Sequence, residues 1–530
     1  MTSSSLLTHW VGVVLTRNWL LLLLVFVSGS ASLATEITAS RLVGPFFGTS
    51  VLIWSVLIGM TLIYLTIGYS IGGRIADRSP QPSTLYQIVA WAGFFIGVVP
   101  FVARPVLLLS LQGFATYDAG ILAGSLIAVN LLFAAPTILL GTVSPFAIRL
   151  AVTNVKDAGH IAGSLYALST LGSIVGTFAP VLLLVPHIGT SKTFLVFAFA
   201  LLLVSLVGLW RTAPRRVPLY AALAAIIVLL LVIFPEGYIK PREEDGKVTL
   251  YETESLYNYI RVMRYPDFNI TILELNEGQA IHSVYNPNGL LTNGVWDYFL
   301  VAPYFANDKR PADVKSLALV GSAAGTVALQ YTKFYGPIPI DGAEIDPAIV
   351  DVGRTYFGMT EPNFTVHVQD GRYWLRNEVR KFDVVAVDAY RPPYIPFHLT
   401  TQEFFSEIKN HLNDNGVLAI NAGHTISDYG LVDVLASTMK SVFPNVYVLD
   451  VPMRGSPVGN SLVIATKSPS RIENFRDNLA RADNPVFQQI GASAENVREV
   501  TATPVVFTDD QAPVEEVVHR ILIHFILTGT

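Results

Sequence analysis

The sequence contains no cysteine, and only 14% of its 530 residues are charged. Without cysteine the chain has no disulfide bond, no zinc–thiolate site and no thiol nucleophile. The formal net charge is −5, and the chain has neither a basic run nor an arginine-rich stripe, so nothing in its charge pattern supports nucleic-acid binding. Soluble domains carry about 25% charged residues, so the deficit points to a chain that is partly inserted in a lipid bilayer.

The charge deficit is concentrated in the first 236 residues, where long apolar runs alternate with short charged loops. Charged residues reach ordinary soluble density after Lys240. We therefore predict an α-helical transmembrane bundle over 1–236, a linker over 237–246 and a soluble α/β part beyond it. A bilayer crossing takes about 20 apolar residues. Seven runs approach this length, at 18–40, 46–72, 84–110, 120–147, 162–186, 193–210 and 217–234.

Positive charges gather in alternate loops between these runs. They are Arg17 before the first run, Arg74 and Arg78 after the second, Arg149 and Lys156 after the fourth, and Arg211, Arg215 and Arg216 after the sixth. The positive-inside rule places this side, and the N-terminus, in the cytoplasm of a multi-pass cell-membrane protein. Seven spans then put the soluble part outside the cytoplasm. An even number, for example after a split near Arg104, would put it inside.

The soluble part begins with a small β-rich subdomain, predicted over 247–310 from alternating runs at 247–251, 259–264 and 270–275. From 311 to 530 the pattern changes to buried strands that alternate with helices. We expect strands at 316–321, 339–344, 364–369, 384–387 and 417–421, and a closing pair at 445–451 and 461–467. This alternation predicts a mostly parallel, doubly wound, Rossmann-like sheet.

Ligands of such sheets bind beyond the carboxyl ends of the strands. Gly321 and Gly325 end the first predicted strand and open a helix, where backbone can approach a ligand closely. Glu344, Asp370 and Asp388 end the next three strands, and an acidic residue about 20 positions after the glycines suits ribose hydroxyls. The pattern favours a nucleoside site. The alternative interpretation is that these acidic residues cap helices.

The same stretches carry a family resemblance. Over about 250–515 the sequence resembles the spermidine synthase (polyamine aminopropyltransferase) family, whose catalytic domain has the AdoMet-methyltransferase fold. The motifs are Leu319–Gly325 (LVGSAAG), Ala343–Pro347 (AEIDP), Gln369–Arg372 (QDGR), Phe382–Ala389 (FDVVAVDA), His398–Phe404 (HLTTQEF), Phe507–Asp510 (FTDD) and Ala512–Glu515 (APVE). The whole chain resembles the membrane-fused members, which carry a multi-span region before this domain.

The resemblance implies a role for each candidate. Decarboxylated S-adenosylmethionine (AdoMet), or AdoMet itself, would be the co-substrate, with no metal. Its nucleoside would be held by Gly321, Gly325 and Glu344, and its adenine would lie at Asp370 and Gly371. Asp388 would accept a proton from the attacking amine, because an amine must lose a proton before it attacks the carbon beside a sulfonium.

The departures from the family pattern fall mainly on the amine side. Ala324 replaces the aspartate of the glycine loop, and Arg391 replaces a second aspartate after the fourth strand. A Tyr-Gln pair appears as Tyr257-Asn258, and a His-Glu pair appears as Asp297-Tyr298. A positive charge at Arg391 would oppose a diamine cation, so the residues expected at the acceptor, Tyr257, Asn258 and Arg391, indicate an altered diamine site.

Three functions are compatible with these patterns. The first is an enzyme that transfers an aminopropyl or related group to an amine or other small acceptor. The second is a non-catalytic membrane protein that uses the fold to bind a ligand or partner. The third, a transporter with a regulatory domain, rests on a loose likeness of Gly68–Arg78 to a transporter loop. A homo-oligomer formed through the soluble part is compatible with all three.

Overall fold

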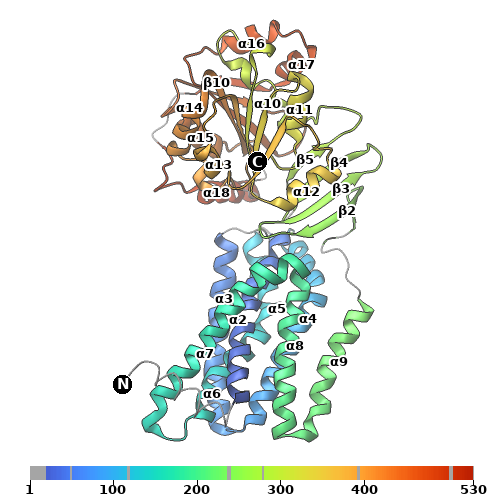
Figure 1. The fold of residues 1–530 in the computed structure, drawn as a ribbon, viewed down its shortest axis with the longest axis vertical. Helices are drawn as coiled ribbons and strands as arrows, with labels where there is room; N and C mark the ends of the chain where they lie inside the picture. The colour runs from blue at the N-terminus through green and yellow to red at the C-terminus, as the bar shows by residue number, and fades with distance from the viewer. Residues whose placement is uncertain are drawn as a thin grey trace. The chain divides into compact units, whose positions relative to one another are not determined.

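The computed structural model describes residues 19–528 apart from 48–50, 116–119, 235–239, 241, 277, 279, 391–393 and 501–504. It divides into two compact units, Met1–Pro241 and Arg242–Thr530. The first unit is a bundle of helices, and the second contains two β-sheets with helices packed on them (Figure 1).

The first unit consists of long helices built almost entirely from apolar residues, and a helix pairs its polar backbone groups within itself, as a bilayer requires. They are α2 (Trp19–Phe47), α3 (Val51–Arg78), α4 (Pro82–Ala115), α5 (Gly120–Gly141), α6 (Val143–Ala151), α7 (Ala158–Ala179), α8 (Val185–Thr212) and α9 (Val217–Ile233). Many large apolar side chains on the outside of the bundle are exposed, as expected of a surface that faces lipid.

Among the described residues, six helical stretches are long and apolar enough to cross a membrane, whereas the sequence suggested seven separate spans. The fifth and sixth expected spans lie in one helical stretch of 58 residues, Val155–Thr212. That stretch is interrupted at Gly189, whose φ of 81° and ψ of 169° are not helical. A straight helix of this length would measure about 87 Å, but α7 and α8 instead form two legs that run in opposite directions (Figure 1).

Small residues bring α2 and α7 into backbone contact. A Cβ atom on Gly172 would lie 2.1 Å from the Phe26 carbonyl oxygen, and one on Gly176 would lie 2.0 Å from that of Ser30. The Ser30 hydroxyl donates to the Gly172 carbonyl at 2.9 Å, and the Ser173 hydroxyl donates to that of Gly29 at 3.2 Å. Small residues one helical turn apart let the two helix backbones approach this closely.

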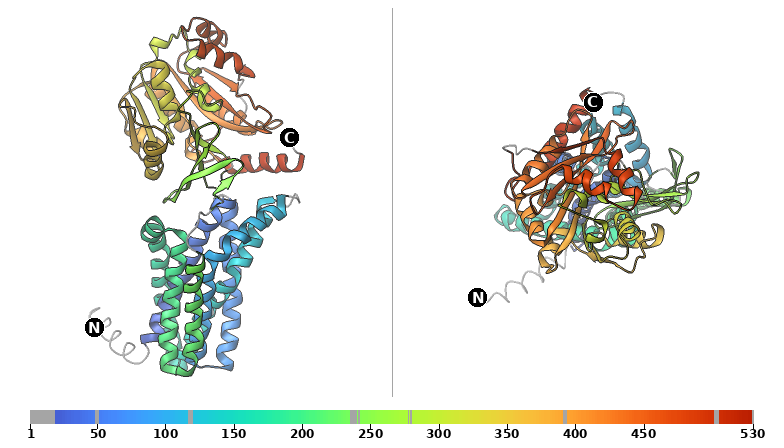
Figure 2. Two further views of the ribbon diagram at one scale, coloured as in Figure 1. Left: turned by 90° about the vertical axis from the view of Figure 1, so that its right-hand side faces the viewer. Right: turned by 90° about the horizontal axis from the view of Figure 1, so that it is seen from above.

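Several cations meet at the end of the bundle where α2 begins. Arg211 lies over the Trp19 ring, 5.0 Å from its centre. Arg149 approaches Asp77 at 3.4 Å, and Arg216 donates to Gln87 at 2.8 Å. The helix α9 starts at this end and finishes at the other end of the bundle (Figure 2). The bundle therefore has one cationic end, and its last helix leads away from it.

The second unit begins with an antiparallel sheet of five strands in sequence order. They are β1 (Glu243–Glu244), β2 (Lys247–Glu254), β3 (Tyr259–Tyr265), β4 (Ile270–Leu275) and β5 (Ile281–Tyr285). The three strands expected from alternation are present, and β5 was not singled out by the sequence. Apolar side chains of β3 and β4 pack against the helix α12 (Pro347–Tyr356), which joins this sheet to the rest of the unit.

The second sheet has eight strands in the order β13-β11-β12-β10-β9-β6-β7-β8. They are β6 (Leu317–Val320), β7 (Ile340–Glu344), β8 (Phe364–Val368), β9 (Phe382–Val387), β10 (Leu412–Thr425), β11 (Asn445–Asp450), β12 (Val458–Thr466) and β13 (Asn496–Glu499). The pairings from β8 to β10 are parallel, and β12 is antiparallel to both of its neighbours. The predicted doubly wound, Rossmann-like sheet is confirmed.

Helices cover both faces of this sheet and bury two separate cores. One core includes side chains of α13 (Gly371–Asn377), α14 (Gln402–His411), α15 (Gly430–Lys440) and α18 (Val514–Thr528). The other includes side chains of α10 (Val295–Phe299), α11 (Thr326–Tyr335), α16 (Glu473–Ala480) and α17 (Pro485–Ser493). Strand order reverses between β6 and β9, so a switch point lies at their carboxyl ends.

Candidate functional site

The residues singled out in the sequence come directly after neighbouring parallel strands. Gly321 follows β6, Glu344 ends β7, Asp370 lies two residues beyond β8, and Asp388 follows β9. Because these four strands are parallel, their carboxyl ends lie along one edge of the sheet. The structure therefore brings the four positions to the edge where ligands of such folds bind.

The glycine loop between β6 and α11 needs glycine at two positions. Gly321 and Gly325 have φ values of 84° and 89°, a region in which side chains are strained. A Cβ atom on Gly321 would lie 2.6 Å from the Asp388 carbonyl oxygen, and one on Gly325 would lie 2.7 Å from the Met359 Cγ. The loop thus lies against the end of β9, and its glycines are required by the fold itself. Their role in nucleoside binding stays a prediction.

Glu344 is buried and holds the glycine loop from the neighbouring strand. Its carboxylate accepts the backbone N–H groups of Ala323 and Asp346, each at 3.0 Å. Burial raises the pKa of this carboxyl to about 7, although the two N–H groups favour its ionised form. A group that titrates near neutrality and already fixes the loop is suited to bind a hydroxyl-bearing ligand there.

Asp370 caps α13, in agreement with the alternative interpretation of the sequence. Its carboxylate accepts the Tyr373 N–H at 2.9 Å, and it also contacts the His398 Nε2 at 3.0 Å. The hydrogen bond with His398 holds the pKa of Asp370 below its usual value. Packing explains the glycine at position 371, because a Cβ atom there would lie 2.6 Å from the Val320 Cγ1. Capping and a ligand role are compatible, since part of Asp370 is exposed.

Arg372 belongs to the 369–372 motif, but the sequence assigned it no role. In the structure its buried guanidinium pairs with Glu407 and Asp509, and we call these three residues the clamp. Its guanidinium donates to both oxygens of Glu407, at 2.9 and 2.8 Å, and to both oxygens of Asp509, at 2.7 and 2.8 Å. It also donates to the His398 carbonyl at 2.9 Å. Such bidentate pairs fix geometry as well as charge. The clamp joins the 369–372 and 507–510 motifs and supports the loop that carries His398.

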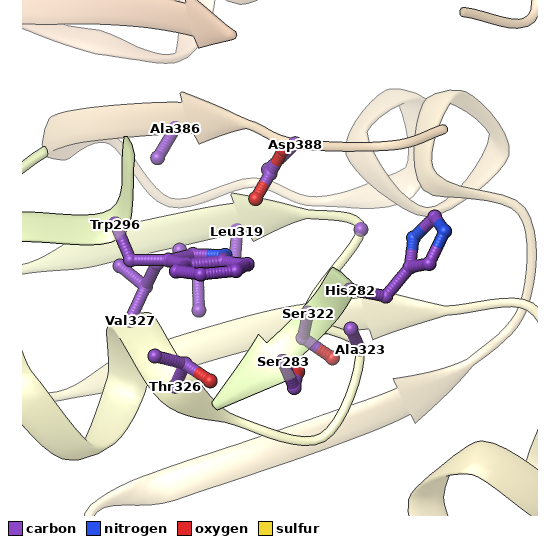
Figure 3. A pocket seen from close by; sticks show the side chains of 11 residues that line it. His282, Ser283, Trp296, Leu319, Ser322, Ala323, Thr326, Val327, Ala386 and Asp388 are labelled. Carbon is purple, nitrogen blue, oxygen red and sulfur yellow. The ribbon is translucent and has the colours of Figure 1, made fainter. Parts of the chain in front are cut away.

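A recess opens beside the glycine loop at the switch point. Its interior measures about 10 Å³, room for about one water molecule, within about 280 Å³ of space that includes open solvent at its mouth, and Figure 3 shows the side chains around it. Its lining consists of His282, Ser283, Trp296, Leu319, Gly321, Ser322, Ala323, Thr326, Val327, Ala386 and Asp388. These residues come from β5, α10, β6, the glycine loop, α11 and the end of β9, so segments that are far apart in the sequence build one cavity.

Asp388 is the one carboxylate among the described residues that line this recess. Its Oδ1 accepts a hydrogen bond from the Asn421 Nδ2 at 2.9 Å, and the Trp296 side chain also hydrogen-bonds to it. Burial raises the pKa of Asp388 to about 6. A carboxylate with this pKa is ionised at neutral pH and accepts a proton more readily than an ordinary aspartate does.

His282 and Trp296 line the recess, and the sequence alone did not identify either of them. Burial lowers the pKa of His282 to about 4, so its ring is neutral at pH 7. Its Nε2 has no hydrogen-bond partner, and neither does the Ser322 hydroxyl. The alternation of β5 signals that one of its faces is buried, but nothing in the sequence shows that this strand passes the end of β9.

The residues expected at the amine acceptor have other surroundings. The Asn258 side chain donates to Asp346 at 2.9 Å and accepts from Asn276 at 3.1 Å, and Tyr257 is 41% exposed. Neither lines the recess. Arg391 lies outside the described residues. The assignment of these three residues to the acceptor therefore stays a prediction.

Comparisons with known proteins bear on this geometry. Residues 307–474 match the Spermine/spermidine synthase domain. A probable polyamine aminopropyl transferase of Bifidobacterium longum (strain NCC 2705) is 32% identical over 281 residues, covering 50% of this chain and 61% of that protein. The polyamine aminopropyltransferase of Vibrio vulnificus (strain CMCP6) is 27% identical over 271 residues, covering 50% and 88%.

Another relative extends the similarity into the helical bundle. Polyamine aminopropyltransferase 2 of Aquifex aeolicus (strain VF5) is 22% identical over 502 residues, which cover 89% of this chain and 94% of that protein. Neither unit alone accounts for 89% of the chain, so the alignment includes both. The chain spans about three fifths of the Bifidobacterium relative and nearly all of the Aquifex one. Residues 307–474 match the spermine/spermidine synthase domain, and the chain is similar to proteins named polyamine aminopropyltransferases, in agreement with the resemblance that its motifs indicated.

Proposed function

We propose that this protein transfers an aminopropyl group from decarboxylated AdoMet to an amine acceptor. The observation that carries the proposal is the Asp388 carboxylate, which faces a recess at the switch point beside the glycine loop. Its raised pKa, about 6, suits a general base. The names of the relatives, polyamine aminopropyltransferases from several bacteria, support the same reaction class.

The nucleoside of the donor would lie along the edge formed by the glycine loop, Glu344 and Asp370. Gly321 and Gly325 leave room for the ligand, and the Glu344 carboxylate would accept hydrogen bonds from ribose hydroxyls. Asp370 and Gly371 would lie at the adenine. Support for this assignment comes from the order of these residues along one sheet edge.

The charge of the recess favours decarboxylated AdoMet over AdoMet. No lysine or arginine is found among the described lining residues, and Asp388 supplies a negative charge. The carboxylate of AdoMet would have no cationic partner there and would be repelled. The ammonium of the decarboxylated donor would meet a favourable field.

We also propose that the first unit crosses the membrane seven times, with α7 and α8 as separate crossings. The cationic end of the bundle would face the cytoplasm by the positive-inside rule. Because α9 leads away from this end, the second unit would follow on the opposite side of the membrane. Protease treatment of oriented right-side-out vesicles tests this: cleavage of the second unit is expected, and its protection would contradict seven crossings.

This topology favours a second candidate function, a non-catalytic domain that binds a ligand or partner. AdoMet-type donors are made in the cytoplasm, so a domain on the other side would meet little donor. The two candidates differ in the step after ligand binding. Only the enzyme consumes the donor when an amine is added.

Calorimetry on the full chain in detergent tests the donor site. Titration with decarboxylated AdoMet is expected to give saturable heat, titration with AdoMet a weaker interaction, and Glu344→Ala little or none with either ligand. Absence of heat with both ligands on the wild-type chain would contradict the enzyme. Saturable donor binding with no turnover of any amine would favour the non-catalytic candidate.

A further inference from the structure

The recess beside Asp388 is smaller than the group that the proposed reaction would place there. Its interior has room for about one water molecule. The aminopropyl group of the donor has three carbon atoms and a nitrogen atom, and each of them is comparable in size with a water molecule. At least one lining side chain must therefore move before this group can lie beside the carboxylate.

Most of the lining is fixed by the fold. Leu319 and Ala386 pair with each other on the neighbouring parallel strands β6 and β9. The Ser283 oxygen accepts a backbone N–H of the glycine loop at 3.0 Å, and the Thr326 hydroxyl donates to a carbonyl of β5 at 3.1 Å. Movement of any of these four residues would disturb the sheet or the glycine loop.

The Trp296 ring is held in a different way. Its side chain hydrogen-bonds to Asp388, and Trp296 is the donor because an indole has one N–H and no acceptor. Figure 3 shows the Asp388 carboxylate pointing toward this ring. The ring also lies against Gly294, where a Cβ atom would be 3.0 Å from the ring carbons Cε3 and Cζ3. A single hydrogen bond and a neighbour without a side chain leave the ring able to turn.

The backbone beneath the ring is anchored by the next residue, Asp297. Its carboxylate accepts the Thr292 N–H at 2.9 Å, the Asn293 N–H at 2.8 Å and the Gln330 side chain at 2.6 Å. These hydrogen bonds hold the start of α10 to its own turn and to α11. A new position for the Trp296 ring therefore requires rotation about its side-chain bonds, and α10 itself stays in place.

We propose that Trp296 closes the recess and orients the Asp388 carboxylate, and that its ring turns aside when the aminopropyl group of the donor enters. This inference rests on the proposed aminopropyl transfer and adds a positioning residue to the same site. Turning the ring breaks its hydrogen bond to Asp388, and the carboxylate then accepts a hydrogen bond from an incoming ammonium instead. With the ring in place, the base is held in position and the aminopropyl chain is excluded.

The affinity for the donor is the first test. Trp296→Phe keeps an aromatic ring but removes the N–H that holds the recess closed. At about pH 8, where Asp388 with its pKa of about 6 is ionised, calorimetry on the full chain in detergent measures the Kd for decarboxylated AdoMet. The variant is expected to have a Kd about tenfold lower than the wild-type chain, because a larger fraction of it is open before binding. An equal or higher Kd would overturn the closing role.

Tryptophan fluorescence follows the ring directly. Trp296 and Trp374 are the two tryptophans of the second unit, and Trp374 is buried outside the recess. In the Trp374→Phe chain, binding of decarboxylated AdoMet is expected to shift the emission to longer wavelength and to increase quenching by acrylamide, because the buried Trp296 ring becomes exposed. The Trp296→Phe, Trp374→Phe double variant should lack both changes. Unchanged or reduced quenching in the single variant would mean that the ring stays in place.

The pH profile tests whether Trp296 orients the base. The indole N–H lowers the pKa of Asp388, so its removal should raise that pKa further. Turnover is measured as release of 5′-methylthioadenosine, the thioether that remains when the donor loses its aminopropyl group. Each rate is divided by that of the same chain carrying Asp388→Asn. In Trp296→Phe the pH of half-maximal rate is expected to lie above that of the wild-type chain. The same profile in both chains would contradict the hydrogen bond.

These outcomes separate the inference from the proposed function. If the chain releases 5′-methylthioadenosine with an amine but donor binding leaves the Trp296 fluorescence unchanged, the transferase stands and the role of Trp296 falls. If the fluorescence changes but no amine is aminopropylated, the transferase falls and the movement of Trp296 stands. If no chain binds the donor, both fall. If Trp296→Phe does not fold, acrylamide quenching of the Trp374→Phe chain with and without donor decides.

Discussion

The two sides of the candidate site differ in what their polar groups do in the folded chain. On the nucleoside side, Glu344 accepts two backbone N–H groups, and Asp370 accepts one and contacts His398. On the acceptor side, the His282 Nε2 and the Ser322 hydroxyl have no partner. The first side is held in shape by its own hydrogen bonds, whereas the second leaves buried polar atoms for a ligand to satisfy.

If the proposed function holds, this difference would let one sheet edge bind a constant donor and a variable acceptor. The nucleoside side uses the ends of β6, β7 and β8, whose positions are fixed by the parallel pairing of the sheet. The acceptor side is completed by β5 and α10, which come from outside that sheet. Changes in those two elements are expected to alter the proposed acceptor recess without moving the strands that would hold the donor.

The largest expected effect is on the acceptor side. Asp388→Asn keeps the size of the side chain but removes the base, so kcat is expected to fall by about 10²–10⁴-fold. Donor affinity should fall by a smaller factor, because the variant loses the charge that would face the donor's ammonium but leaves the nucleoside side unchanged. Release of 5′-methylthioadenosine measures the first quantity, and calorimetry measures the second. A variant that keeps most of its kcat would remove Asp388 from the chemistry.

The clamp under the nucleoside side gives the next largest effect. Arg372→Met removes the buried partner of Glu407 and Asp509, although Glu407 keeps Arg376 at 2.6 Å and Asp509 keeps the Thr401 hydroxyl at 2.7 Å. Breaking a buried ion pair costs about 3–5 kcal/mol of unfolding free energy, so a loss at the lower end, about 3 kcal/mol, is expected. Arg376→Met is the matched control, since Arg376 also pairs with Glu407 but its side chain is 55% exposed, so about 0–1 kcal/mol is expected. Urea unfolding of the full chain in detergent compares the two. Equal destabilisation would show that the buried clamp is unimportant.

Glu344→Gln tests the nucleoside side alone. The ribose hydroxyls would lose a charged hydrogen-bond acceptor, which is worth about 1.5–3 kcal/mol, so the donor Kd is expected to rise by about 10–100-fold. The kcat at saturating donor should stay close to that of the wild-type chain. A large fall in kcat would mean that the two sides of the site are not separate.

The pH dependence of the rate tests whether Asp388 is the general base. Since the pKa of Asp388 is raised to about 6, the carboxylate is ionised above this pH and becomes protonated below it. The rate of the wild-type chain relative to Asp388→Asn is therefore expected to halve near pH 6 and to fall about tenfold by pH 5. Dividing the wild-type rate by the Asp388→Asn rate at each pH cancels the protonation of the acceptor amine, because it affects both chains equally. A ratio that stays constant down to about pH 4.5 would contradict the raised pKa.

The smallest expected effect is a proton released on donor binding. The pKa of Glu344 is raised to about 7, so about half of the empty sites are protonated at pH 7. Hydroxyl donors stabilise the ionised carboxylate and lower its pKa, so binding should release about half a proton. Calorimetry in buffers of different ionisation enthalpy measures this quantity. Release of the same size by Glu344→Gln would point to another group.

Much of the fold could be predicted because it depends on local patterns. Buried strands that alternate with helices predicted the parallel sheet, and acidic residues after successive strands had to meet at one edge of it. Gly321 and Gly325 have positive φ values, as their place between a strand and a helix suggested. The apolar runs predicted the bundle, although the fifth and sixth runs lie in one helical stretch that is interrupted at Gly189.

The parts that could not be predicted depend on contacts between distant segments. Arg372 and Asp509 are 137 residues apart, and no local pattern pairs them. His282 and Trp296 reach the recess only because β5 and α10 pack beside the end of β9. The hydrogen bonds of Asp297 likewise involve a distant residue, because the Gln330 side chain donates to its carboxylate at 2.6 Å.

The most direct test of the proposed reaction is product formation by the full chain in detergent with decarboxylated AdoMet and a set of small primary amines and diamines. Mass spectrometry is expected to show one N-aminopropylated amine for each 5′-methylthioadenosine formed, and about 1% or less of either product with Asp388→Asn over the same time. Saturable donor binding without either product would contradict the assignment of this site as an aminopropyltransferase.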